Sequence, residues 1–120
     1  MSIKLFDSEL KVMEVLWRQG DTTAKELAQI LNKEVGWSKT TTYTVIKKCV
    51  DKGAIKRIEP KFVCHPLVTR EEAQAFETNE LIEKMYDGAE DQLIANLLGR
   101  NELSKEEIDS LKKLVQRLEE

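Results

Sequence analysis

The sequence contains few of the residues from which metal centres and catalytic sites are built. It has two cysteines and one histidine, and they do not occur in CxxC or HxxxH spacing. Zinc sites need several such ligands at short spacings, so Cys49 and Cys64 are expected to be buried structural thiols, with no metal or cofactor. The chain also lacks a glycine-rich phosphate loop and a nucleophile in an identifiable motif with a base, and His65 is its only histidine. These absences argue against an enzyme.

The sequence also lacks a long apolar run and a charged leader followed by an apolar stretch. A membrane-spanning helix needs about 20 predominantly apolar residues, and a secretory leader has a charged start and an apolar middle. We therefore expect a cytoplasmic protein without membrane insertion, in a reducing compartment where the cysteines stay free. The chain does have many charges, because Asp, Glu, Lys and Arg make up 34% of it against 41% apolar residues. That balance is typical of soluble, helix-rich globular chains.

The charges divide the chain near residue 68. Residues 1–68 contain twelve Lys and Arg against eight Asp and Glu, a net charge of +4, whereas residues 69–120 contain seven against fourteen, a net charge of −7. A partner responds to the local field more than to the net charge of −3 of the whole chain. We therefore predict a basic domain over residues 1–68 and an acidic domain over residues 69–120.

The basic half is organised around residues 37–52, WSKTTTYTVIKKCVDK. A helix that begins after Ser38 as its N-cap has one apolar stripe, made of Thr42, Val45, Ile46 and Cys49. Its opposite face is small, hydroxylated and basic, and such a face can contact phosphates and base edges. We predict that this helix enters the major groove of DNA, and an ordinary solvated face is the alternative. The predicted DNA contacts on it are Ser38, Lys39, Thr40, Thr41, Tyr43, Thr44, Lys47 and Lys48.

Two more helices are predicted before this segment. The segment DSELKVMEVLWRQG opens with Asp7 and Ser8 as candidate caps and ends at Gly20 as the stop. Its apolar residues at helical spacing are Leu10, Met13, Leu16 and Trp17. Thr23 and Glu26 form a capping box that begins the next helix, and a glycine breaks the chain at residue 36. Three short helices with short connections are the order of a helix-turn-helix on a three-helix core.

A hairpin is predicted after the third helix. Apolar and polar residues alternate on both sides of the pair Glu59 and Pro60, which indicates two short antiparallel strands. A hairpin in this position is the wing of a winged helix. Its basic residues Lys56, Arg57 and Lys61 are expected beside the helix that contacts DNA, and a role in the core alone is the alternative.

The acidic half is predicted to consist of three amphipathic helices. Capping boxes begin the first and the last of them, Thr69 with Glu72 and Ser104 with Glu107, and a shorter helix lies between. About fifty residues bury little surface alone, so the apolar faces need another surface. We predict a second copy of the chain, and packing onto the first domain is the alternative. The predicted dimer contacts are Leu81, Met85, Leu93, Leu97, Ile108, Leu111, Val115 and Leu118.

Several segments resemble the BlaI/MecI/CopY family of winged-helix repressors, namely VMEVLW, SKTTTYTVIKK, KGAIKR, YDGAEDQLIANLL and ELSKEEIDSLKKLV. The resemblance covers nearly the whole chain. It implies a mostly α fold, with a winged helix-turn-helix of three helices and a two-stranded wing followed by a three-helix dimerisation domain. It also implies a homodimeric transcriptional repressor bound to a palindromic double-stranded DNA operator. The copper branch carries Cys-x-Cys pairs near the C-terminus, and no cysteine follows Cys64 here, which leaves the β-lactam resistance branch or a relative that answers another signal.

The resemblance further implies a route of release. In the β-lactam branch a membrane sensor-protease leads to cleavage of an Asn-Phe bond in the second C-terminal helix. The matching position here is Asn96 followed by Leu97, so the asparagine agrees and the phenylalanine does not. A winged helix that binds protein instead of DNA is the other functional alternative. Such a module can carry an apolar or acidic outward face, whereas the face predicted here carries Lys, Thr and Tyr.

Overall fold

The computed structural model describes residues 3–100 and 102–119, and its packing divides them into two compact units. The first unit ends at Thr78 and the second begins at Asn79, so both contribute to helix α4 (Arg70–Tyr86). The division predicted from charge at residue 68 lies just before this helix. The first turns of α4 belong to the first unit because Ala73 lies in its core and Glu77 forms an ion pair with Lys4.

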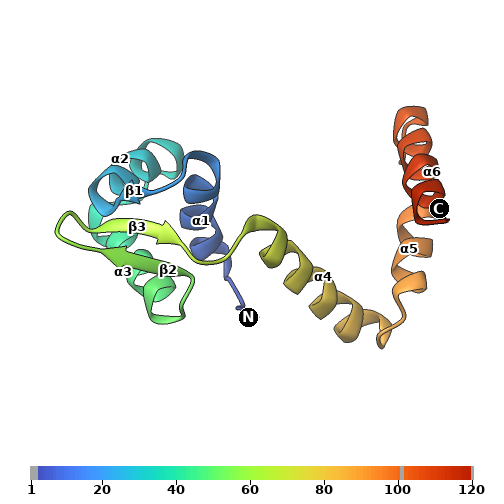
Figure 1. Cartoon of the computed structure of the whole chain (residues 1–120), viewed down its shortest axis with the longest axis horizontal. Helices are drawn as coiled ribbons and strands as arrows, with labels where there is room; N and C mark the ends of the chain where they lie inside the picture. The colour runs from blue at the N-terminus through green and yellow to red at the C-terminus, as the bar shows by residue number, and fades with distance from the viewer. Residues whose placement is uncertain (1–2, 101, 120) are drawn as a thin grey trace. The chain divides into compact units, whose positions relative to one another are not determined.

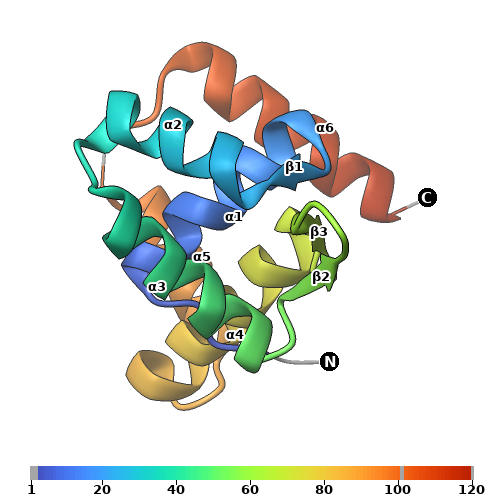
Figure 2. The ribbon, with the colours of Figure 1, turned by 90° about the vertical axis from the view of Figure 1, so that its left-hand side faces the viewer.

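Among the described residues, the first unit contains three complete helices and a three-stranded sheet (Figures 1 and 2). The elements are α1 (Asp7–Gln19), β1 (Thr22–Thr23), α2 (Ala24–Val35), α3 (Lys39–Asp51), β2 (Ile55–Ile58) and β3 (Val63–Pro66). All strands are antiparallel, in the order β1-β3-β2, and Cys64 of β3 lies between Thr22 and Arg57. The predicted winged helix-turn-helix is confirmed. The two-stranded wing has a third strand, β1, which is too short for its alternation to be read from sequence.

The core of the first unit lies where α1, α2 and α3 meet the sheet. Helix α1 contacts both other helices and β3, and α3 contacts β2. The predicted apolar stripe of α3 is buried, including Thr42, whose hydroxyl donates to the carbonyl of Ser38 at 3.2 Å. The largest fully buried side chains are Met13, Leu16, Leu27, Leu31, Ile46 and Ile55. One face of α3 is therefore held in the core, which leaves its other face for solvent.

In the first unit, the starts of α1, α2 and α3 agree with the predicted caps in two of three cases. The Thr23 hydroxyl accepts the amide of residue 26, and the Ser38 hydroxyl accepts the amide of residue 41, so both predicted caps are confirmed. The candidate caps Asp7 and Ser8 are wrong. The residue that precedes α1 is Phe6, and its amide donates to the carboxylate of Glu9 at 2.8 Å. Glu9 lies at the third helical position and thus supplies the half of a capping box that binds the amide of the residue before the helix.

The second unit contains the end of α4, then α5 (Glu90–Leu98) and α6 (Lys105–Glu119) (Figure 1). The predicted capping boxes are both formed, with Thr69 and Glu72 at the start of α4 and Ser104 and Glu107 at the start of α6. Hydrogen bonds from backbone amides stabilise the two carboxylates, which lowers the pKa of Glu72 and of Glu107 below the ordinary value. None of the helices in the described ranges is long and apolar enough to cross a membrane.

Candidate functional site

The outward face of α3 is the most distinctive polar surface of the first unit. Seven of the eight side chains predicted there are exposed, and Tyr43 is half-buried. The first turn of the helix contains no acidic residue. The positive end of the helix dipole and the side chain of Lys39 therefore favour an anion at this end.

The hydroxyl groups on this face differ in how many hydrogen bonds they can still form with a ligand. The Thr44 hydroxyl donates to the carbonyl of Thr40 at 2.9 Å, so it can only accept a further hydrogen bond or present its methyl group. The Ser38 hydroxyl donates to that of Thr41 at 3.0 Å. The Thr40 hydroxyl makes no hydrogen bond within the described ranges and can both donate and accept. Such a set can contact phosphates and base edges, including the methyl group of thymine.

The connection between α2 and α3 is held by a contact that sequence reasoning missed. The side-chain amide of Asn32 donates to the carbonyl of Trp37 at 2.9 Å. Gly36 ends α2 with a φ of 74°, in the left-handed region that favours glycine. An asparagine shortly before a helix-ending glycine is a weak signal by itself. In this fold it fixes the tight turn that sets α3 against α2.

The far end of α3 is held by a buried ion pair. Lys52, which follows the last residue of α3, donates to the carboxylate of Glu9 at 2.6 Å and to the carbonyl of Lys4 at 2.7 Å. The Glu9 side chain is 3% exposed. These partners are more than forty residues apart in the chain, so no local pattern indicates the pair. Helix α3 is thus anchored at both of its ends.

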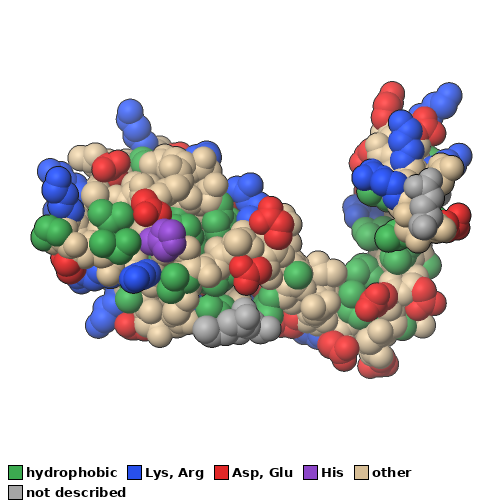
Figure 3. All heavy atoms as spheres, viewed as in Figure 1, with side chains coloured by type: hydrophobic (Ala, Val, Ile, Leu, Met, Phe, Trp, Pro, Cys, Tyr) green, Lys and Arg blue, Asp and Glu red, His purple; other side chains and the backbone are tan. Residues whose placement is uncertain are grey.

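The wing carries the three predicted basic residues, and all of them are exposed. Figure 3 shows Lys and Arg side chains gathered around the end of the first unit that carries the wing. Lys56 lies opposite His65, whose Nδ1 is 2.7 Å from the carboxylate of Asp21. Arg57 forms an ion pair with Glu59 through its Nε, on the other face of the hairpin.

Two aromatic rings connect the wing to α3. The guanidinium carbon of Arg57 lies 3.7 Å from the ring centroid of Phe62, and that ring meets Tyr43 of α3 edge-on, with centroids 6.0 Å apart. Phe62 is one of the alternating residues after Pro60 from which a strand was predicted, but β3 begins one residue later, at Val63. The sequence does not indicate the contact between Phe62 and Tyr43 or the ion pair between Glu59 and Arg57, because both depend on how the hairpin folds.

The thiols are set apart from this surface. Cys49 and Cys64 are both buried and free, as predicted. Burial raises the pKa of Cys49 to about 12 and that of Cys64 to about 11, so both remain protonated at neutral pH. Within residues 3–100 and 102–119, no group of three His, Cys, Asp or Glu side chains is arranged to hold a metal ion.

Ten of the fourteen exposed large hydrophobic side chains in the described part of the chain lie in the second unit. Neither α5 nor α6 has a buried residue. Seven of the eight predicted dimer contacts are exposed, and Leu93 is half-buried. Apolar side chains are visible over α5 in Figure 3. Leu118 is 87% exposed, an unusual environment for a leucine on an amphipathic helix.

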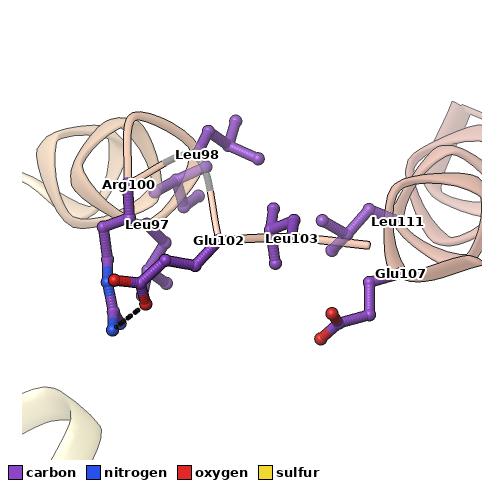
Figure 4. Close-up of a pocket in the computed structure, with 8 residues that line it drawn as sticks. Leu97, Leu98, Arg100, Glu102, Leu103, Glu107 and Leu111 are labelled. Carbon is purple, nitrogen blue, oxygen red and sulfur yellow. Dashed lines mark hydrogen bonds and ion pairs between the residues drawn. The ribbon is translucent and has the colours of Figure 1, made fainter. Parts of the chain in front are cut away.

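An open cavity of about 380 Å³ lies between α5 and α6. Its wall includes Leu97 and Leu98 of α5 and Leu111 of α6, with the ion pair of Arg100 and Glu102 at its edge (Figure 4). Asn96, the first residue of the predicted cleavage bond, is exposed, as is Leu97. Both residues of the predicted bond are therefore exposed on α5 within the second unit.

Comparison with known proteins gives consistent matches. The model of the family described as penicillinase repressor matches residues 5–117. The chain is 26% identical over 115 residues to the penicillinase repressor of Bacillus licheniformis, covering 94% of this chain and 90% of the relative. It is 25% identical over 114 residues to the methicillin resistance regulatory protein MecI of Staphylococcus aureus (strain N315), covering 93% of each. It is also similar to the solution structure of monomeric Bacillus licheniformis BlaI in complex with the blaP half-operator, with a TM-score of 0.52 and 27% identity, over 60% of this chain and 90% of that one.

Proposed function

The chain belongs to the penicillinase repressor family and is a DNA-binding repressor of that family, and we propose that it acts as a homodimer on a palindromic operator. The observation that carries the proposal is the outward face of α3, which is hydroxylated and basic and has no acidic residue in its first turn. Each copy of α3 reads one half of the operator from the major groove. The similar BlaI monomer, solved with a half-operator, supports one winged helix for each half-site.

The residues of this surface divide into two roles. Thr40 and Thr44, near the start of α3, contact base edges, because N-terminal residues of a recognition helix reach deepest into the groove. Lys47 and Lys48 bind the DNA backbone, which positions the helix without reading sequence. The remaining proposed contacts to DNA are Ser38, Lys39, Thr41 and Tyr43 on the helix and Lys56, Arg57 and Lys61 on the wing.

The second unit holds the two copies together. Its exposed leucines and isoleucines form an apolar surface that a unit of this size cannot cover by itself. A second copy offers the same surface and a two-fold axis, which matches the symmetry of a palindrome. Two linked winged helices bind far more tightly than one, because the second binds at a high local concentration.

The regulated genes are proposed to be those of β-lactam resistance, as the named relatives suggest. Release then follows a cut after Asn96 that depends on a membrane sensor-protease. A cut there removes α6 and the end of α5, and so splits the apolar surface while leaving α3 and the wing intact. A repressor of this family that answers another signal is the second candidate, because Leu97 replaces the phenylalanine that the resemblance implies.

Selection of duplexes from a randomised pool tests the operator. The full chain is expected to enrich a palindrome whose half-sites are centred about 10 bp apart, or a multiple of that distance. Enrichment of a single half-site, or of nothing, counts against the dimeric repressor.

For release, a host that carries a sensor-protease is treated with a β-lactam, and the parent is compared with Asn96→Asp. A fragment ending at residue 96 is expected from the parent alone. Induction with the parent left intact would support the second candidate.

A further inference from the structure

Phe62 lies where three elements of the first unit meet. Its ring forms a T-shaped contact with that of Tyr43 on α3, at an interplanar angle of 86°, and the guanidinium carbon of Arg57 on β2 lies 3.7 Å from its centroid. Its backbone carbonyl accepts the amide of Ala24 at the start of α2, at 2.9 Å. One residue in the turn of the hairpin therefore links the wing to both helices of the helix-turn-helix.

The backbone of Phe62 has a conformation that is unfavourable for phenylalanine. Its φ is 52°, in the left-handed region where a bulky side chain is costly and glycine is favoured. Among the described residues of the first unit, no other residue except glycine has a positive φ. Backbone strain of this kind persists where the surrounding contacts over-determine it, and it occurs often at functional sites. A glycine would relieve this strain, but it would lose the contacts of the ring with Tyr43 and Arg57.

The contact with Arg57 leaves the charged end of that residue available. Glu59 binds this guanidinium through its Nε. The Arg57 side chain is 50% exposed. A guanidinium stacked on a ring is fixed in its plane, yet its edge can still donate two parallel hydrogen bonds to an anion.

We propose that Phe62 is a positioning residue that holds Arg57 of the wing for a phosphate of the DNA backbone, beside the groove that α3 enters. The inference rests on the DNA-binding role proposed for α3. Because the same ring contacts Tyr43 and Arg57, the place of the guanidinium relative to α3 is set before DNA arrives, which lowers the cost of ordering it on binding. Glu59 is the internal counter-ion of the same guanidinium, so its negative charge opposes the phosphate.

The test uses the full chain and a duplex that this chain enriches from a randomised pool, with affinity measured by fluorescence anisotropy at several salt concentrations. Phe62→Leu is expected to weaken binding about 5-fold and to reduce the salt slope by about one unit, as loss of one phosphate contact does. Arg57→Ala gives losses of the same size, and the double variant binds like Arg57→Ala alone. Phe62→Trp, which keeps a ring, retains the parental slope. Glu59→Gln binds more tightly than the parent.

The matched control is Phe6→Leu, because Phe6 also lies against a cation, Lys52 at 4.8 Å, but just before α1 and outside the wing. Its affinity and salt slope are expected to equal those of the parent. Arg57→Lys leaves the fold of the turn untouched and keeps the charge, but an ammonium cannot stack as a plane, so it is expected to bind more weakly than the parent.

Two results would overturn the positioning role. The first is that Phe62→Leu weakens DNA binding by the same factor whether residue 57 is arginine or alanine. The ring would then act on the wing by a route other than Arg57. The second is parental affinity for Arg57→Lys, which decides the matter even if Phe62→Leu fails to fold. If the parent enriches no duplex at all, the proposed function fails together with this inference, and that outcome is seen before any variant is compared.

Discussion

The carboxylate of Glu9 and the ammonium of Lys52 lie 2.6 Å apart and join the first turn of α1 to the end of α3. Each also holds a backbone group, since Glu9 accepts the amide of Phe6 and Lys52 donates to the carbonyl of Lys4. The pair is shielded from water on the side of Glu9, which is 3% exposed. It therefore sets the direction of the helix that is proposed to contact DNA.

Removing the cation from this pair should destabilise the first unit strongly. Lys52→Met leaves a buried carboxylate without its partner, and we expect the free energy of unfolding to fall by about 3 kcal/mol. The control is Arg18→Met, because Arg18 and Glu34 form a pair at 2.8 Å in which both side chains are half-exposed. That change should cost less than about 1 kcal/mol. Urea unfolding measures both, and equal costs would show that burial of Glu9 does not matter.

The two proposed roles on α3 predict different losses of DNA affinity. Thr44→Ala is expected to cost about 1 to 3 kcal/mol at one base pair of the enriched operator and to relax specificity there. Lys47→Ala is expected to weaken binding to every duplex and to lower the salt slope by about one unit. Titrations of operator and unrelated duplex over a range of salt separate these effects. If Thr44→Ala and Lys39→Ala both bind the operator as tightly as the parent does, the proposal that α3 enters the major groove is wrong.

The apolar surface of the second unit predicts the oligomeric state. Leu111→Asp places a charge in the wall of the cavity between α5 and α6 and is expected to shift the chain to monomer in sedimentation at tens of micromolar. The matched control is Leu67→Asp, because Leu67 is 50% exposed but lies in the first unit. It should sediment as the parent does. If the parent itself sediments as a monomer at this concentration, the proposed dimer is wrong.

A truncation gives a second measure of the same surface. Residues 1–78 retain Val68 and Ala73, which belong to the core of the first unit, together with the carbonyl that accepts the indole N–H of Trp17. This fragment is expected to be folded and monomeric and to bind the palindrome at least 100-fold more weakly than the full chain. Cutting at residue 68 instead would remove Ala73 from the core, so it should also lower the unfolding temperature.

The buried thiols predict a loss of stability in alkali. Their pKa values rise from 9.0 to about 12 for Cys49 and about 11 for Cys64 on folding. Below pH 9 both states are protonated and the full stability is present. Above it the unfolded thiols ionise first, so the free energy of unfolding falls by about 1.4 kcal/mol per pH unit for each thiol.

This alkaline loss can be measured by urea unfolding at pH 8 and pH 10 under reducing conditions. Cys49→Ala lowers stability at both pH values because it leaves a cavity, but it should show a smaller difference between them than the parent. If the difference is unchanged, other groups cause the alkaline loss and the thiols do not.

By itself the sequence determined the features that depend on neighbours within one or two helical turns. The buried stripe of α3, the caps at Thr23 and Ser38 and the hairpin around Glu59 and Pro60 could all be predicted, because spacing and capping are local. The start of α1 was predicted wrongly even so. The cap was sought in Asp7 or Ser8, whereas the residue before the helix is Phe6 and the carboxylate of Glu9 accepts its amide.

Only the tertiary structure decided how the candidate DNA surface is held. The pair of Glu9 and Lys52 joins residues 43 positions apart, and the contacts of Phe62 with Tyr43 and Arg57 require the hairpin to fold back onto α3. The third strand and the division of the chain within α4 arise in the same way. The physical reason is that such contacts depend on the positions of whole elements, and the free energy of packing sets those positions rather than any residue's preference for its neighbours.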